Sequence, residues 1–300
     1  ITYIGDYTGA NTDGVGGVVR ITGSDNDQTV ARANAITATT KTYRTFEGFA
    51  FDTTSSHTID ALTGCTNWII DKCAFGSVSA SGVAAIRFTG LAQANNTVQN
   101  CIAVGGRAAL VYFTHSATVS DAGHIVQNCL ALAIVNRMLL IERVGGITVR
   151  NCLALSHGTV GIHVSIALAV GQTVTVNNCI FQNCATAVSA TAVGEITENY
   201  NTFFSNGTDR TNTNTGANSV AYPPLFDPRW VFQLINIQAA AQLISPFDLA
   251  SFSQLVNLAG TSPTTTDLRG QAILGAQREW GALEYNSVLK KMGQILRPYG

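Results

Sequence analysis

Carboxylates are the side chains whose spacing in this chain tests most directly for an active site. Cleavage of a glycosidic bond requires two carboxyl groups roughly 5–9.5 Å apart. Between residues 71 and 188 the acids are Asp71, Asp121 and Glu142, and each has a different place in the local sequence pattern. Asp121 lies in Ser-Asp-Ala-Gly-His, a composition typical of a turn. We therefore find no carboxylate pair here and assign no catalytic residue.

Elimination at a uronate would use a base that works near neutral pH, usually beside a calcium site built from several carboxylates. Five arginines supply cations, but no acidic cluster accompanies them: Arg87, Arg107, Arg137, Arg143 and Arg150. His157 and His163 are six residues apart, and we interpret both as loop or surface residues. No nucleophile elbow, phosphate loop or dinucleotide fingerprint is present. The sequence predicts no cofactor and no metal site, and it favours a non-enzymatic role.

Five cysteines recur in one local frame, which makes them the strongest signal in the chain. Each follows two mostly polar residues: Asp71-Lys72-Cys73, Gln99-Asn100-Cys101, Gln127-Asn128-Cys129, Arg150-Asn151-Cys152 and Asn177-Asn178-Cys179. The gaps between these cysteines are 28, 28, 23 and 27 residues. A repeat of this period is typical of a solenoid. Because the units carry short β-rich runs and no helix-length amphipathic segment, each unit is predicted to be one coil of a parallel β-helix.

The frame extends beyond the cysteines in both directions. Phe49 takes the cysteine position 24 residues before Cys73, and Asn201 takes it 22 residues after Cys179. Residues 17–22 fit an opening coil. We predict an all-β fold, a parallel β-helix of about seven or more coils.

The repeated positions predict two internal ladders. If the cysteines face the core, they form a column of reduced thiols that behave as small apolar residues. The residues before them, Asn100, Asn128, Asn151 and Asn178, predict an asparagine ladder whose side-chain amides bond to one another. Reduced thiols indicate folding in a reducing compartment such as the cytoplasm.

A later strand in each unit predicts the outward face. This strand contains one triplet in each unit: Ile86-Arg87-Phe88, Leu110-Val111-Tyr112, Leu139-Leu140-Ile141, Ile162-His163-Val164 and Ala187-Val188-Ser189. Taking the middle residue of each triplet as outward gives Arg87, Val111, Leu140, His163 and Val188. Three of these five are aliphatic, and an exposed apolar stripe would mark a protein contact surface. A register displaced by one residue, or a loop that covers the stripe, is the alternative.

Composition restricts the classes of partner. Apolar residues make up 46% of the chain and charged residues 12%, about half the usual share. The net charge of −1 gives no basic surface for nucleic acid or an anionic membrane. No apolar run approaches the roughly 20 residues of a membrane-spanning helix. We expect neither nucleic acid nor membrane as a partner.

The carboxyl-terminal third departs from the cysteine frame and carries three other segments. They are Tyr222-Pro223-Pro224-Leu225-Phe226-Asp227-Pro228, then Ser253-Gln254-Leu255-Val256-Asn257-Leu258-Ala259-Gly260, then Thr266-Asp267-Leu268-Arg269-Gly270 with Glu279-Trp280-Gly281-Ala282-Leu283-Glu284-Tyr285. This order resembles the carboxyl end of right-handed parallel β-helix proteins of the pectate-lyase-like superfamily, in which DPLF, SPAID-G and DIGAxEY segments follow one another. Glu279-Trp280 stands where Asp-Ile is usual, and Asn257 where Asp is usual.

The resemblance implies a single-stranded right-handed parallel β-helix with a carboxyl-terminal cap over the open end of the solenoid. It implies no single activity, because the superfamily includes lyases, hydrolases, adhesins, phage tailspikes and other virion proteins. We divide the chain into coils over 1–206, final coils and cap over 207–285, and an apolar tail over 286–300. A short helix in that tail would align Leu289, Met292, Ile295 and Leu296 for an assembly contact.

Three functions therefore compete. The favoured one is a non-enzymatic structural protein of a virion surface, a decoration or spike protein, with self-association, other virion proteins or surface carbohydrate as its partners. The second is a polysaccharide lyase or glycoside hydrolase, which rests on analogy within the superfamily. The third is a bacterial surface adhesin. The expected location is a virion surface or the extracellular space, after folding in a reducing cytoplasm.

Overall fold

The computed structural model describes residues 1–5, 19–22, 34–52, 56–76, 84–105, 108–119, 122–132, 136–155 and 158–224. All of its regular structure is β-strand. None of the described residues belongs to a helix long and apolar enough to cross a membrane. The expected tail residues Leu289, Met292, Ile295 and Leu296, and the resemblance segments from residue 225 onward, lie outside the described residues.

The strands form three parallel sheets of eight strands each. The first sheet contains β1 (Thr2–Ile4), β4 (Thr45–Glu47), β7 (Ile69–Asp71), β10 (Thr97–Gln99), β13 (His124–Gln127), β16 (Ile147–Arg150), β19 (Val174–Asn177) and β22 (Ile196–Asn199). The second contains β2 (Val19–Thr22), β5 (Phe49–Asp52), β8 (Ala74–Phe75), β11 (Ile102–Val104), β14 (Leu130–Leu132), β17 (Leu153–Leu155), β20 (Ile180–Gln182) and β23 (Thr202–Phe204). The third contains β3 (Ile36–Ala38), β6 (Ile59–Ala61), β9 (Ala84–Thr89), β12 (Ala109–Val119), β15 (Arg137–Val144), β18 (Val160–Ile166), β21 (Thr186–Ser189) and β24 (Thr208–Thr211).

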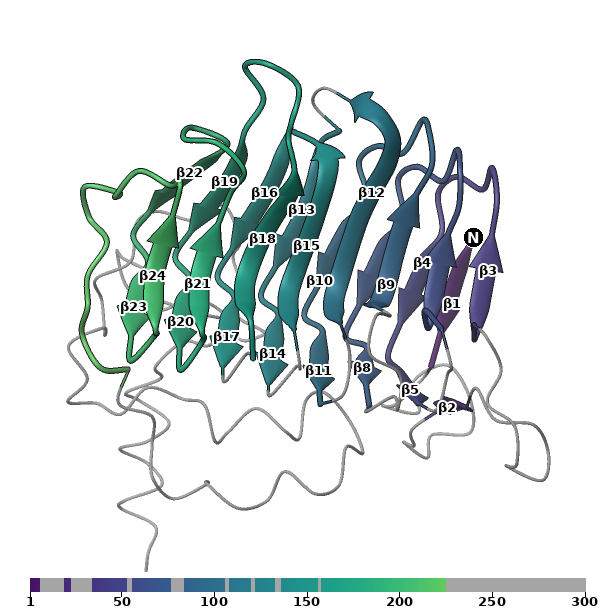
Figure 1. Ribbon diagram of the computed structural model, residues 1–300. Helices are drawn as coiled ribbons and strands as arrows, with labels where there is room; N and C mark the ends of the chain where they lie inside the picture. The colour runs from purple at the N-terminus through teal and green to yellow at the C-terminus, as the bar shows by residue number, and fades with distance from the viewer. Residues whose placement is uncertain are drawn as a thin grey trace, which may run out of the picture.

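Each coil visits the first, second and third sheets in turn and then returns to the first, one strand further along (Figure 1). The path is right-handed, as the chirality of parallel crossovers favours. The expected right-handed parallel β-helix is thus the observed fold. The stack is slightly longer than the repeat between residues 17 and 206 indicates, because β1 and β24 also join the sheets.

The five frame cysteines line one side of the core. They are Cys73, Cys101, Cys129, Cys152 and Cys179, each at most 1% exposed, and all seven cysteines of the chain are free thiols. The thiols donate to backbone carbonyls, for example Cys101 Sγ to Gln99 O at 3.1 Å. Burial raises the pKa of Cys101 and Cys129 well above the usual thiol value. The column therefore packs as small apolar side chains.

The asparagine before each cysteine makes the turn from the first sheet into the second. Asn100, Asn128, Asn151 and Asn178 all have φ between 52° and 56°, a left-handed conformation that asparagine tolerates better than most residues. Asn128 Nδ2 donates to Asn100 Oδ1 at 3.1 Å, and Asn100 Nδ2 donates to Asp71 Oδ1 at 2.7 Å. One residue type thus supplies both the turn conformation and the contact to the next coil.

The second sheet is buried on both faces. Cys101 and Ala103 belong to the core, so the residue between them, Ile102, points to the opposite side. Ile102, Leu130, Leu153 and Ile180 are aligned by the strand register and are only 0–2% exposed. This aliphatic column lies outside the core, but it is not a solvent surface.

A buried histidine interrupts the aliphatic core. His124 stacks on Phe113 with ring centroids 4.5 Å apart, and its Nδ1 accepts a hydrogen bond from Asn96 N at 3.2 Å. Nε2 has no partner among the described residues. Burial, together with a smaller contribution from His115, lowers the pKa of His124 to about 3. The native state therefore holds this imidazole neutral.

The coil from β22 to β24 places an ion pair at core-facing positions. Strand register places Glu198 beside Val176 and Arg210 beside Val188, both in core-facing columns. The Glu198 carboxylate accepts from Arg210 Nε at 2.9 Å, and the Arg210 guanidinium lies 4.0 Å from the Phe203 ring centroid. We call this group the polar plug, and its further donors to Glu198 are Asn201 Nδ2, Ser219 Oγ and Gly216 N at 2.8, 2.6 and 2.6 Å.

The pKa of His124 predicts a loss of stability in mild acid. Below pH 6.5 the histidine binds a proton in the unfolded state but stays neutral in the native state. The free energy of unfolding therefore falls as the pH drops from 6.5 toward 3. Between pH 7 and pH 5 the loss from this one residue is about 2 kcal/mol. His124→Asn keeps an acceptor near the Nδ1 position but does not titrate. Urea unfolding at both pH values should show a loss that is smaller by that amount in the variant, and an equal loss in both proteins would contradict the assignment.

The polar plug predicts strongly non-additive mutations. Arg210→Met leaves a carboxylate with a fully buried side chain without its cation, which should cost about 3 kcal/mol of unfolding free energy. The double variant Glu198→Gln/Arg210→Met should cost less than Arg210→Met alone, because no buried charge remains. Lys72→Met is the matched control, since the Lys72–Glu47 pair is partly solvated and worth less than about 1 kcal/mol. Additive effects in urea unfolding would refute the coupling.

Candidate functional site

Polar side chains lie together on the outward face of the third sheet. Strand register aligns one outward residue from each of six successive strands, β6 to β21, and we call this set the outer column: Asp60, Arg87, Tyr112, Leu140, His163 and Ser189. The strands that carry its middle part, β9, β12, β15 and β18, are the longest of the sheet and lie side by side toward the viewer in Figure 1. Their length extends this face on both sides of the column.

The expected apolar stripe on this face is wrong in two places. Val111 and Val188 are fully buried, and they align with Ile86, Leu139 and Ile162 in the core. The physical reason is a break in strand alternation, because Leu110 and Val111 both belong to the core, as do Ala187 and Val188. The outward residues of those coils are Tyr112 and Ser189. Arg87, Leu140 and His163 do face outward, which leaves Leu140 as the one aliphatic member of the outer column.

Asp60 and Arg87 form the first polar contact of the outer column. Arg87 donates from Nε and from its terminal nitrogen to the two Asp60 oxygens, at 2.8 and 2.7 Å. This two-bond geometry between a guanidinium and a carboxylate is among the stronger polar contacts in proteins. Asp60 is only 4% exposed, so its charge is satisfied within the protein, whereas Arg87 keeps part of its surface toward solvent.

Glu142 lies at the centre of the face, where three hydroxyls hold its carboxylate. Tyr112 Oη and Thr114 Oγ donate to Glu142 Oε2 at 2.6 and 2.9 Å, and Ser165 Oγ donates to Oε1 at 3.3 Å. Burial, followed by the hydrogen bond to Glu142, raises the pKa of Tyr112 above its usual value. The phenol therefore remains protonated and donates, and the half-exposed carboxylate keeps a fixed orientation.

Arg137 and His163 form the next contact on the same face. Arg137 Nε donates to His163 Nδ1 at 2.9 Å. Burial and then the Arg137 charge lower the pKa of His163 below its usual value, so the imidazole is neutral near pH 7. Because Nδ1 accepts, the ring proton resides on Nε2, which leaves a donor beside the anionic Glu142.

This arrangement lacks the carboxylate pair of a glycosidase. Asp60 lies on β6 and Glu142 on β15, with β9 and β12 between them, which corresponds to a separation of about 14 Å. That exceeds the roughly 5–9.5 Å needed for paired acid chemistry. Among the described residues, no three His, Cys, Asp or Glu side chains come close enough to hold a metal ion. The face instead offers a fixed array of donors, acceptors and one aromatic ring.

The other residues considered from sequence are dispersed. Arg150 donates to Gln127 on the first sheet, and Arg143 donates to the backbone oxygen of His115. Arg107, Asp121 and His157 lie outside the described residues. The sequence alignment of the triplets does not predict the cluster at Glu142, because Leu110-Val111-Tyr112 is displaced by one residue from the register of β12 with β15. Aligning Val111-Tyr112-Phe113-Thr114 with Leu139-Leu140-Ile141-Glu142 would have placed Tyr112 and Thr114 beside Glu142.

Comparisons with known proteins add little to this geometry. No family model matches the chain, and no curated protein matches it. Among solved structures, the chain is similar to one described as the crystal structure of pectate lyase Pel9A, with 14% sequence identity and a TM-score of 0.33. The similarity covers 95% of this chain and 86% of that one. At this level it carries no argument about function.

Proposed function

We propose that this chain is a non-enzymatic structural β-helix of a virion surface that contacts a glycan through the outward face of its third sheet. The observation that carries the glycan contact is the Glu142 cluster. Its carboxylate is already held by Tyr112 and Thr114, and a neutral His163 stands in the adjacent coil. Such a face supplies oriented acceptors and donors for sugar hydroxyls. Because these protein side chains are already ordered, binding does not carry the entropy cost of ordering them.

The rigidity of the scaffold supports the same proposal. The face belongs to a sheet whose neighbours are joined by parallel ladders from β3 to β24, so its side chains keep a spacing of about 4.8 Å from coil to coil. A polymeric sugar of regular repeat can meet several coils at once. Contacts repeated along one ligand raise the overall affinity although each is weak alone.

Two observations support the virion setting. Seven free, buried thiols favour folding in a reducing compartment, where intracellular virion proteins assemble. The low charge content suits a protein that packs into an assembly. The apolar stripe expected from the sequence does not support this setting, because Val111 and Val188 face the core. The expected self-association or contact with other virion proteins therefore rests on the tail, and it stays a proposal.

A polysaccharide-cleaving enzyme is the second candidate, and Glu142 is the observation that favours it. This carboxylate is half-exposed and lies beside a protonated Tyr112. An assay for new reducing ends and unsaturated uronate products, run on the polysaccharides of the binding experiment below, separates the two functions. Product formation that disappears in Glu142→Gln would replace the structural proposal.

Glycan binding should depend on the third sheet and not on its neighbours. We expect that Glu142→Gln and Thr114→Ala each weaken binding to a retained polysaccharide about tenfold, since each removes roughly one charge-assisted hydrogen bond or the group that orients it. Thr148→Ala is the matched control, because Thr148 occupies an outward position on β16 of the first sheet. A panel of neutral and acidic bacterial surface polysaccharides, assayed by biolayer interferometry, would test this. Equal binding by all four proteins, or binding to no polysaccharide, would refute the glycan contact.

Self-association should depend on the tail. Size-exclusion chromatography with light scattering would compare the full chain with a version that ends at Tyr285. We expect an oligomer for the full chain and a monomer for the shortened one, because the removed segment contains Leu289, Met292, Ile295 and Leu296 in one apolar pattern. A monomer in both forms would remove the support for an assembly contact at this end.

A further inference from the structure

A cavity at the amino-terminal end of the solenoid is the second place where ligand-binding chemistry gathers. Its volume is about 320 Å³, near the lower limit for small-molecule sites. It lies between β1, β3 and β4, and its lining residues are Tyr3, Ile36, Thr37, Ala38, Lys41, Arg44, Phe46 and Trp68. This location is distant in sequence from Glu142 and uses other strands of the fold.

Aromatic rings form one wall of the cavity. Tyr3 stacks on Phe46 with ring centroids 4.9 Å apart, and Phe46 meets Trp68 at 5.5 Å. Phe46 and Trp68 are nearly buried, whereas Tyr3 is 43% exposed and so presents ring surface that the core does not use. The Trp68 indole is fixed because its Nε1 donates to Lys41 O at 2.7 Å. The aromatic wall is therefore rigid, with Tyr3 as its accessible part.

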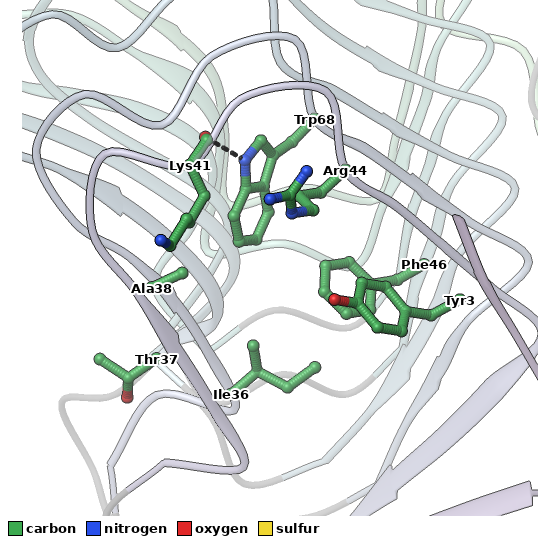
Figure 2. Close-up of a pocket in the computed structure, with 8 residues that line it drawn as sticks. All are labelled: Tyr3, Ile36, Thr37, Ala38, Lys41, Arg44, Phe46 and Trp68. Atoms are coloured by element: carbon green, nitrogen blue, oxygen red, sulfur yellow. Dashed lines mark hydrogen bonds between the residues drawn. The ribbon is translucent and has the colours of Figure 1, made fainter. Parts of the chain in front are cut away.

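Two cations face this wall, with no carboxylate among the lining residues. Figure 2 shows Lys41 across the cavity from Tyr3 and Phe46, with Trp68 and Arg44 between them. Arg44 uses one terminal nitrogen to donate to Thr42 O at 2.9 Å, which anchors the guanidinium to its own turn. Within the described part of the chain, neither Lys41 nor Arg44 forms an ion pair. The described residues thus give the cavity a positive edge with no carboxylate paired to it.

The polar plug, at the other end of the described strands, differs from this cavity in its balance of charge. At that end the inward positions hold Glu198 and Arg210, which neutralise each other in the polar plug. At this end the cations Lys41 and Arg44 have no acidic partner among the described residues, although Glu47 in the same coil pairs with Lys72 on the outer face. The positive edge at this cavity would be neutralised by an anionic ligand.

We propose that this cavity binds a sugar acid, a pyranose ring that carries a carboxylate, with the ring against Tyr3 and the carboxylate at Arg44 and Lys41. Guanidinium and ammonium groups bind carboxylates through charge-assisted bonds. An aromatic face binds the apolar face of a sugar ring through its buried area. The hydroxyl of Tyr3, at the edge of the cavity, supplies a partner for a sugar hydroxyl. The site is independent of the glycan contact proposed for the third sheet.

The test uses the full chain with ¹⁵N-labelled tryptophan and D-glucuronate as the probe. The Nε1–H resonance of Trp68, assigned with Trp68→Phe, should shift on titration with a Kd on the order of 1 mM. Arg44→Gln should weaken binding at least about tenfold, in line with the loss of one charge-assisted interaction. Arg150→Gln removes the same charge from the first sheet and should leave the Kd unchanged.

Other probes decide between ligand classes. D-Glucose should produce no shift at the same concentration, because it lacks the carboxylate, and benzoate should bind more weakly because it lacks the hydroxyls. An equal shift with glucose, or tighter binding of benzoate, would overturn the sugar-acid assignment. No Trp68 shift with any probe, or equal weakening by Arg150→Gln, would overturn the site itself. These outcomes are separate from the polysaccharide assay, which reports on Glu142 and Thr114.

Discussion

The left-handed residue between the first and second sheets is the constraint on which the rest of the structure depends. Every coil from Lys72 to Asn178 turns at one residue with φ near 52–56°, so the two strands beside it keep a fixed angle and a fixed offset. Because side chains on a strand alternate, one displaced turn would move a whole column from the core to solvent. The asparagine side chains add a bond to the neighbouring coil and thereby hold successive turns in line. The thiol column, which begins at the very next residue, inherits this alignment.

The same regularity explains why much of the fold can be predicted from the sequence. The Asn-Cys pairs mark a position where conformation and packing both restrict the residue type, and the structure places them in one turn and one core column. The third sheet has no comparable marker. Its strands begin with two consecutive core residues, such as Leu110 and Val111, and a simple alternation of inward and outward residues then fails. Glu142 was visible in the sequence, but its neighbours could be assigned only from the register between coils.

Charge placement was the least predictable property. Glu198 and Arg210 have ordinary sequence contexts, and nothing in those contexts indicates that both occupy inward positions of the final coil. Their burial follows from the register of β22 and β24, which places both residues in core-facing columns. In the same way, Lys41 and Arg44 become a positive edge only because space remains beside Trp68. Neither arrangement has a counterpart in the repeated Asn-Cys frame.

The polar plug has a consequence for how a protein of this kind can change its length. A coil inserted directly after β24 would have to stack apolar residues on an ion pair, whereas a coil inserted between β12 and β21 would meet the same aliphatic columns on both sides. Duplication or deletion of a unit is therefore better tolerated between β12 and β21 than next to the polar plug. Evolution or design can lengthen the molecule in steps of about 4.8 Å while the polar plug is retained.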